Sequence, residues 1–183
     1  VSVLALGIAM LALGTGTASA DCTPAATSNV AAACTGTTTN QGAGAPGTSG
    51  STFGYGTGVE TGMAVSVAAG ATVTGSTAGL YIHDGSIFNA GAITGTVLNG
   101  VQGYDLAIVN AAGATITGRN NAIEGFSSFA ILNAGTISGN AGFLSPFGSG
   151  TLTNLAGGVI SGGVGGGDGL VTVINSGSIS GGV

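Results

Sequence analysis

Residues Ile131-Leu132-Asn133-Ala134-Gly135-Thr136-Ile137-Ser138-Gly139 carry the motif on which most of this chain is patterned. The same order returns along the second two-thirds of the sequence: an aliphatic residue two places before an Asn, then Ile followed by Thr or Ser and Gly. The marker residues of these copies are Asn89, Asn110, Asn133, Asn154 and Asn175. A degenerate earlier copy, 68–75, has Val67 in place of the Asn, and successive markers lie 21 to 23 residues apart.

A repeat of this length, built from short β-branched runs separated by Gly and Asn, predicts an all-β fold. We expect a parallel β-helix (β-solenoid) of about six turns, with roughly 21 residues per turn, over residues 60–183. A leucine-rich repeat would need dense Leu and a helical segment, and the units show no apolar spacing of three and four residues. Disorder is disfavoured because aliphatic residues recur in phase.

The positions within each unit have different predicted roles. The residue two before each Asn is always aliphatic, so it should point into the core, as should Ile137 and its equivalents. The closing Gly should sit at a turn, where a positive φ costs it nothing. A looser third strand is expected through Leu80–Ile82, Val101, Ala122–Ile123, Phe143–Leu144 and Leu170–Val171.

The marker Asn residues are interpreted as structural. Stacked at about 4.8 Å, each carboxamide can donate to one neighbour and accept from the other, which makes a ladder at one corner of the solenoid. Val67 would end that ladder at its first turn. Repetition on every turn suits a ladder and does not suit a localised catalytic site.

The first twenty residues have the pattern of a secretory signal peptide. An apolar run from Val3 to Leu13 is followed by Ala18-Ser19-Ala20, so cleavage is expected after Ala20. The run is shorter than the ~20 residues that a transmembrane helix needs. Residues 21–59 are rich in Gly, Thr and Ser and show no hydrophobic period, which predicts a flexible lead-in or a loosely folded N-terminal cap.

Cys22 and Cys34 are the two cysteines of the chain. An even count in an exported segment favours one disulfide that closes a short loop and helps to cap the solenoid. A lipidated Cys22 is disfavoured because Ala20-Asp21 lacks the small residue expected directly before it. No ligand cluster accompanies the cysteines, and His83 is the sole histidine, so a zinc site is not predicted.

Composition narrows the range of partners. The chain has six acidic residues and one basic residue, Arg119, for a formal charge of −5. Nucleic acid and anionic lipid surfaces are therefore not expected partners. The Gly-rich run 162–168 has its Asp one place late for a calcium nonapeptide, and no Gly-rich stretch has the strand-to-helix context of a phosphate loop. No cofactor is predicted.

Asp84 and Asp105 are the candidate catalytic or cation-binding residues of the chain. Each lies five residues before a marker Asn on successive turns, so the two could stack about 5 Å apart. That spacing suits a retaining glycosidase pair or a weak cation site. Ser128 and Ser149 occupy the same offset on the next turns, which favours a turn role for both carboxylates. His83 has no nucleophile at a recognisable spacing.

A group of aromatic residues falls in the variable part of the units, near the third strand. Aligned along one side of a solenoid, they could contact a glycan or a protein; the alternative is that they pack over an imperfect strand. The group is Tyr81, Tyr104, Phe126, Phe129, Phe143 and Phe147.

Taken together, several stretches resemble the passenger region of bacterial autotransporters. They are Ala18-Ser19-Ala20, Asp21-Cys22-Thr23-Pro24, the segment Cys34–Asn40, the segment Ala68–Gly75 and the repeated Asn-Ala-Gly-Thr-Ile-Ser-Gly unit. The resemblance implies a right-handed parallel β-helix at the cell surface or secreted, and a C-terminal translocator barrel in the outer membrane beyond this fragment. Amphipathic barrel strands are not visible in residues 1–183.

The expected function is therefore that of an exported, non-catalytic module that presents its surface for adhesion to a host or matrix glycan or protein, or for self-association. Two alternatives stay open: a fragment of a polysaccharide-active β-helix enzyme, and a structural stalk that holds another domain away from the cell.

Overall fold

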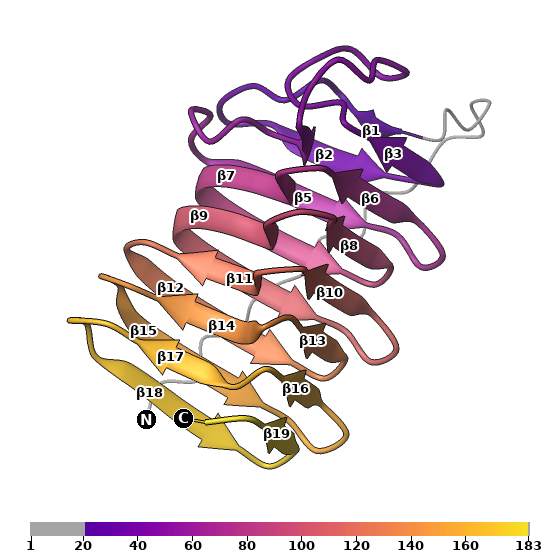
Figure 1. The fold of residues 1–183 in the computed structure, drawn as a ribbon. Coiled ribbons are helices and arrows are strands. Elements are labelled where there is room, and N and C mark those ends of the chain that lie inside the picture. The colour runs from indigo at the N-terminus through magenta and orange to yellow at the C-terminus, as the bar shows by residue number, and fades with distance from the viewer. Residues whose placement is uncertain (1–20, 183) are drawn as a thin grey trace.

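The computed structural model describes residues 21–182 as a column of stacked strands. The predicted signal peptide, 1–20, lies outside the described residues. Figure 1 shows the chain running along the column from the indigo end to the yellow end, one turn at a time. The described part contains strands, turns and bends and no helix.

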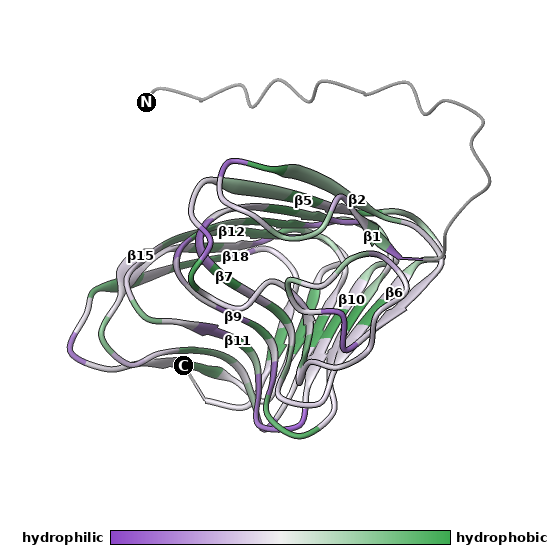
Figure 2. Ribbon diagram, turned by 90° about the horizontal axis from the view of Figure 1, so that it is seen from above, coloured by the Kyte–Doolittle hydropathy of each residue, from purple (hydrophilic) through white to green (hydrophobic). Residues whose placement is uncertain are grey.

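Each turn contributes strands to three groups around the axis, which Figure 2 shows from above. The strands that end at the marker position are β2 (Ala31–Cys34), β5 (Met63–Val67), the second halves of β7 (Ala78–Asn89) and β9 (Asn99–Asn110), β12 (Ser128–Asn133), β15 (Ser149–Asn154) and β18 (Val171–Asn175). After the corner come β3 (Thr37–Thr39), β6 (Thr72–Gly75), β8 (Ala92–Gly95), β10 (Thr115–Gly118), β13 (Thr136–Ser138), β16 (Val159–Ser161) and β19 (Ser178–Ser180). The third group is β4 (Phe53–Tyr55), the first halves of β7 and β9, β11 (Asn121–Gly125), β14 (Ala141–Ser145) and β17 (Val164–Gly166).

The pairing between turns is parallel and in register with the repeat. Asn110 aligns with Asn89 and with Asn133, and Ile116 aligns with Ile93 and Ile137. The prediction of an all-β parallel solenoid of about six turns, some 21 residues apart, is confirmed. A parallel ladder of this kind needs a long connection between paired strands, and here the rest of each turn is that connection.

The core consists of columns of aliphatic side chains, because alternate residues of each strand point inward. Ile93, Ile116, Ile137 and Ile160 are fully buried in one column, and the residues two before each Asn form another. Burial of an Ile side chain stabilises the fold by about 1.5–3 kcal/mol. The outward positions between them carry mostly Thr and Ser.

The third strand follows the prediction in four turns and departs from it in the last. Leu80, Val101, Ile123 and Phe143 align with one another and are buried. Val164 is the next member of this column, because it pairs with Phe143. The expected segment Leu170–Val171 instead leads into β18, whose Val171 aligns with Gly150. The third strand of this turn is β17, which lies in a Gly-rich stretch without the aliphatic pattern of the other turns.

The segment 21–59 differs from the expectation of a flexible lead-in. Strand β2 pairs in parallel with β5, β3 with β6 and β4 with β7, so the segment forms a further turn on the first predicted repeat. Strand β1 (Cys22–Thr23) adds antiparallel to β2 at the end of the column. Small side chains and backbone pairing suffice here, because the neighbouring turn supplies a complete template.

At the closing Gly of most units, a side chain is excluded by close backbone contacts and not by a positive φ angle. At Gly118 an added Cβ would collide with the backbone of Asn121, and the φ angle there is not positive. Gly162 and Gly181 do adopt positive φ, at 95° and 105°. The predicted reason holds for these two glycines and not for the earlier copies.

Within residues 21–182, no helix has the length and hydrophobicity needed to cross a membrane.

Candidate functional site

The marker Asn side chains form a continuous hydrogen-bonded ladder at the corner after the first strand group. Nδ2 of each Asn donates to Oδ1 of the next along the chain, from Asn89 through Asn110, Asn133 and Asn154 to Asn175, and each of these four bonds is 2.8 Å long. The first four side chains are fully buried. A ladder of this kind lets one side chain type satisfy both its donors and its acceptor in the core.

Backbone groups complete the ladder. In the first four Asn residues Nδ2 also donates to a carbonyl on the following turn, as from Asn89 to the Thr115 oxygen at 2.9 Å. After Asn89, Asn133 and Asn175, the Gly two places on donates its N–H back to Oδ1, at 3.2 Å for Gly135 and Asn133. A Cβ at Gly135 would meet the Ala111 carbonyl and Nδ2 of Asn110, so this turn has no space for a larger residue at that position. These contacts give the Asn residues a structural role.

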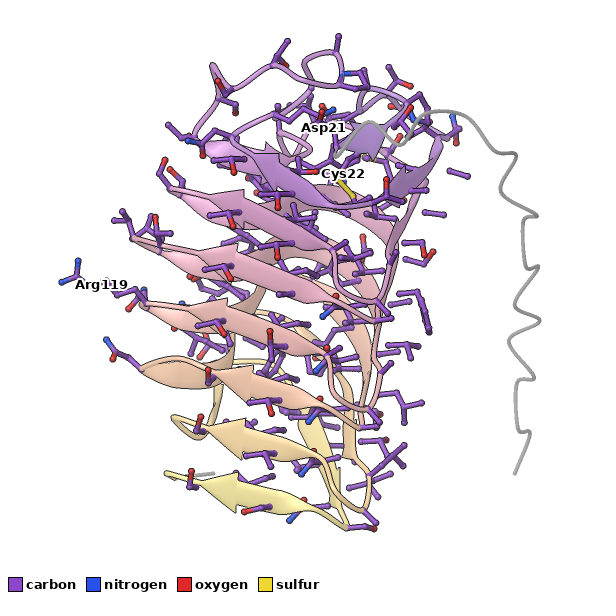
Figure 3. The ribbon with its side chains drawn as sticks, turned by 90° about the vertical axis from the view of Figure 1, so that its right-hand side faces the viewer. Asp21, Cys22 and Arg119 are labelled. Atoms are coloured by element: carbon purple, nitrogen blue, oxygen red, sulfur yellow. A yellow bond between two sulfur atoms is a disulfide. The ribbon has the colours of Figure 1, made fainter. Side chains whose placement is uncertain are left out.

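The same column continues toward the N-terminal end without Asn. Val67 aligns with Asn89 and Cys34 aligns with Val67, and both are buried. Cys34 forms a disulfide with Cys22 on the antiparallel strand β1, as the yellow bond in Figure 3 shows. Gln41 adds two hydrogen bonds to the Cys22 backbone, accepting from its N–H at 3.2 Å and donating to its carbonyl at 2.8 Å. The disulfide and Gln41 thus cover the first turn.

Asp84 and Asp105 occupy successive turns, in register, but their carboxylates have different partners. Asp84 Oδ1 accepts from the Gly62 N–H on the preceding turn at 2.6 Å. Asp105 Oδ1 accepts from the Ser128 N–H at 3.1 Å and its hydroxyl at 2.6 Å on the following turn. The two Ser128 bonds lower the pKa of Asp105 against a small opposing effect of burial. Each carboxylate therefore ties adjacent turns together.

His83, Tyr104 and Phe126 form a ladder of rings on one side of the column. The His83 and Tyr104 rings are stacked with centroids 4.7 Å apart, and those of Tyr104 and Phe126 are tilted at 5.2 Å. Tyr104 is 37% exposed, whereas His83 and Phe126 are partly buried. The three rings therefore pack against one another along this side of the column.

The remaining aromatic residues do not join this ladder. Phe129 and Phe143 are core residues, 5% and 0% exposed, with ring centroids 4.6 Å apart. The prediction of a contact surface is wrong for these two, because Phe129 aligns with the inward Leu106 and Phe143 with the inward Ile123. Tyr81 packs beside Phe53 at 5.1 Å, and burial raises its pKa. Phe147 is isolated and 71% exposed.

A polar cluster beside the ring ladder was not anticipated from the sequence. Asn99 Nδ2 donates to Glu124 Oε2 at 2.6 Å and to Gln102 Oε1 at 3.3 Å. Burial raises the pKa of Glu124, and the Asn99 bond only partly offsets that effect. Gln102 aligns with Tyr81 and with Glu124. Alignment of the third strands would have revealed this column, but that strand is the least regular of the repeat.

A second unanticipated carboxylate lies near the N-terminal end. Glu60 is 5% exposed and accepts from the Thr57 N–H at 2.9 Å and the Thr57 hydroxyl at 2.7 Å. Burial acts to raise the pKa of Glu60, yet the bonds from Thr57 prevail and lower it. Burial, with a smaller effect of Glu60, raises the pKa of Tyr55 to about 12. These groups hold the turn that leads into β5.

The other sequence features take part in the stacking. The Gly-rich run 162–168 contains β17, which pairs with β14. In the part of the chain that the structure describes, no group of three or more His, Cys, Asp or Glu residues is arranged to hold a metal ion. Arg119 projects from the side of the column in Figure 3.

Comparison with known proteins adds no family: no family model matches the chain, and neither a curated protein nor a solved structure matches it significantly.

Proposed function

We propose that this chain is an exported, non-catalytic passenger module of an autotransporter-like surface protein, and that its solenoid surface serves adhesion or self-association. The observation that carries the proposal is the nature of the outward side chains. In the strand group from β3 to β19 they are mostly Thr and Ser on successive turns and none is charged, which gives that face a uniform polar surface. Such faces suit contact with an extended partner, since the same chemistry is offered again at each step of about 4.8 Å.

Two further observations support export and a binding role. The disulfide between Cys22 and Cys34 is of a kind that persists in oxidising compartments. The carboxylates with most catalytic potential, Asp84 and Asp105, are engaged in bonds that join turns. These bonds give both carboxylates a structural role that needs no substrate.

Bacteria that produce the full chain with its translocator test the proposal. We expect them to adhere to matrix proteins, glycans or one another more strongly than bacteria that display an Ile116→Asp variant with a disrupted core. N-terminal sequencing of the exported chain should begin at Asp21. Equal adhesion by the two strains, or cleavage of acidic polysaccharides by the purified chain that Asp84→Asn and Asp105→Asn abolish, would contradict the proposal.

A further inference from the structure

One face of the solenoid carries a column of outward side chains that are apolar on four of its six turns. It is formed by the outward residues of β5, β7, β9, β12, β15 and β18, and we call it the apolar face. Its ridge is the aligned column Ser66, Phe88, Val109, Leu132, Thr153 and Ile174. Its groove is the parallel column of smaller residues Ala64, Ser86, Ala107, Ala130, Thr151 and Thr172.

Three large apolar side chains of the ridge are exposed to solvent. Phe88 is 36% exposed, Leu132 37% and Ile174 53%. Single exposed apolar residues are ordinary on protein surfaces, but Phe88, Val109 and Leu132 follow one another on three successive turns, and such a cluster is typical of a contact surface. The strand group after the Asn corner, from β3 to β19, carries mostly Thr and Ser at its outward positions, with Ala92 and Val159 as the exceptions. The apolar line is therefore a property of one face and not of the repeat as a whole.

Three features identify a second copy of this chain as the partner. None of the twelve ridge and groove residues is charged, so two such faces meet without repulsion. Both copies have the same rise of about 4.8 Å per turn, so a fit at one turn is repeated at every other. The apolar face is also self-complementary in shape, since the larger side chains of the ridge on one copy can fit the groove of smaller side chains on another.

The ridge and groove determine how two copies can face each other. A two-fold axis parallel to the solenoid axis places the ridge of each copy against the groove of the other. A two-fold axis along the strands would set ridge against ridge and leave the grooves empty. Closed two-fold pairs of this isologous kind are the commonest form of homo-oligomer.

We propose that the apolar faces of two copies pack together, with the solenoid axes parallel and the ridge of each in the groove of the other. The inference rests on the proposed surface function and names one partner for it. Six strands span about 29 Å and five residues about 17 Å, so the pair would bury roughly 1,000 Å² in total. That is the lower limit for a specific interface and predicts a weak dimer. Parallel axes suit copies anchored on one cell, where the local concentration is high.

Sedimentation velocity over a concentration series tests the contact. We expect a reversible monomer–dimer equilibrium for the full chain. Leu132→Glu should raise the dimer Kd at least about tenfold, since it places a carboxylate from each copy in a dry contact. Thr117→Glu is the matched control, because it adds the same charge to the strand group after the Asn corner, outside the apolar face, and should leave the Kd unchanged. Thermal unfolding of both variants verifies that they fold.

Cross-linking tests the orientation. Oxidation of a mixture of Ala130→Cys and Leu132→Cys chains should give mixed dimers in excess, because Leu132 of one copy lies opposite Ala130 of the other. Preferential Leu132→Cys homodimers would overturn the parallel arrangement. A chain that stays monomeric, or equal weakening by Leu132→Glu and Thr117→Glu, would overturn the interface. Adhesion that persists in a monomeric chain would refute this inference alone and leave the proposed function standing.

Discussion

The individual residues that matter most are the marker Asn residues, because each satisfies a partner on both adjacent turns. Asn133 accepts from Asn110 and donates to Asn154, both at 2.8 Å, with no exposure to solvent. Loss of one carboxamide therefore leaves a buried donor on one side and a buried acceptor on the other. Hydrogen bonds in such a chain also polarise one another, so the effect of a deletion extends beyond one pair.

Asn133→Ala should lower the free energy of unfolding by about 2–5 kcal/mol, because each buried group left unpaired costs about 1–3 kcal/mol. Urea denaturation followed by circular dichroism measures the loss. Asn140→Ala is the matched control at an exposed position and should change stability by less than about 0.5 kcal/mol. Equal losses in the two variants would show that the ladder is not a source of stability.

Glu60→Gln should destabilise the fold at neutral pH by about 1–2 kcal/mol, because the amide replaces a charged acceptor of two Thr57 bonds. The folded-state pKa of Glu60 lies below its ordinary value of 4.5, so the wild-type advantage is present above pH 4.5. It should vanish as the pH falls through the lowered pKa. Melting temperatures of both proteins across this range test the sign, and a constant difference would contradict it.

Glu124→Gln should have the opposite effect. The folded-state pKa of Glu124 is raised by burial, so its favourable contribution exists below the ordinary value of 4.5 and is lost as the pH rises through the raised pKa. At pH 7 the variant should therefore be more stable than the wild type, by about 0.5 kcal/mol. The gain should shrink in acid, and a variant that is less stable than the wild type at pH 7 would refute the assignment.

At the level of elements, the regular strands differ from the third strand in what defines them. The strands before and after each Asn alternate inward and outward residues, and each of these turns has an inward Ile. The third strand holds residues as different as Leu80, Phe143 and Val164 in one column. Its positions are defined by the regular strands on either side, since each turn must return to the same corner.

The N-terminal turn is an element that depends on a covalent link. Reduction of the Cys22–Cys34 disulfide should lower the free energy of unfolding by about 3 kcal/mol, the loop-entropy value for a closure of this size. Thermal melts with and without reductant measure the change. A double Cys22→Ser, Cys34→Ser variant is the control, since its melting temperature should not respond to reductant. An unchanged wild-type melt would show that stacking alone holds the cap.

For the molecule as a whole, the scarcity of charge means that burial and hydrogen bonding provide the stability. Six acidic residues and one basic residue offer few ion pairs for salt to screen. The free energy of unfolding should therefore change by less than about 0.5 kcal/mol between about 0.05 M and 0.5 M NaCl. Urea titrations at the two ionic strengths test this, and a larger decrease in salt would reveal an ion-pair network that the fold does not suggest.

The sequence pattern located the aromatic candidate contact residues along the chain, but only the fold determines which of them are exposed. The sequence placed six aromatic residues near the third strand, yet Phe126 lies in the ring ladder on the surface while Phe129 lies in the core. They are three positions apart, and the chain bends between β11 and β12. Only the path of the bend determines which side chain turns inward.

The sequence by itself determined the period, the parallel direction, the inward Ile columns and the Asn corner, because each depends on a repeat that every turn obeys. Only the tertiary structure decided that residues 22–55 form a further turn, that Asp84 and Asp105 reach opposite neighbours, and that Asn99 meets Glu124. The reason is physical. These contacts join residues about 20 to 35 positions apart in non-repeating segments, and they arise when stacking of the regular strands brings the irregular ones together.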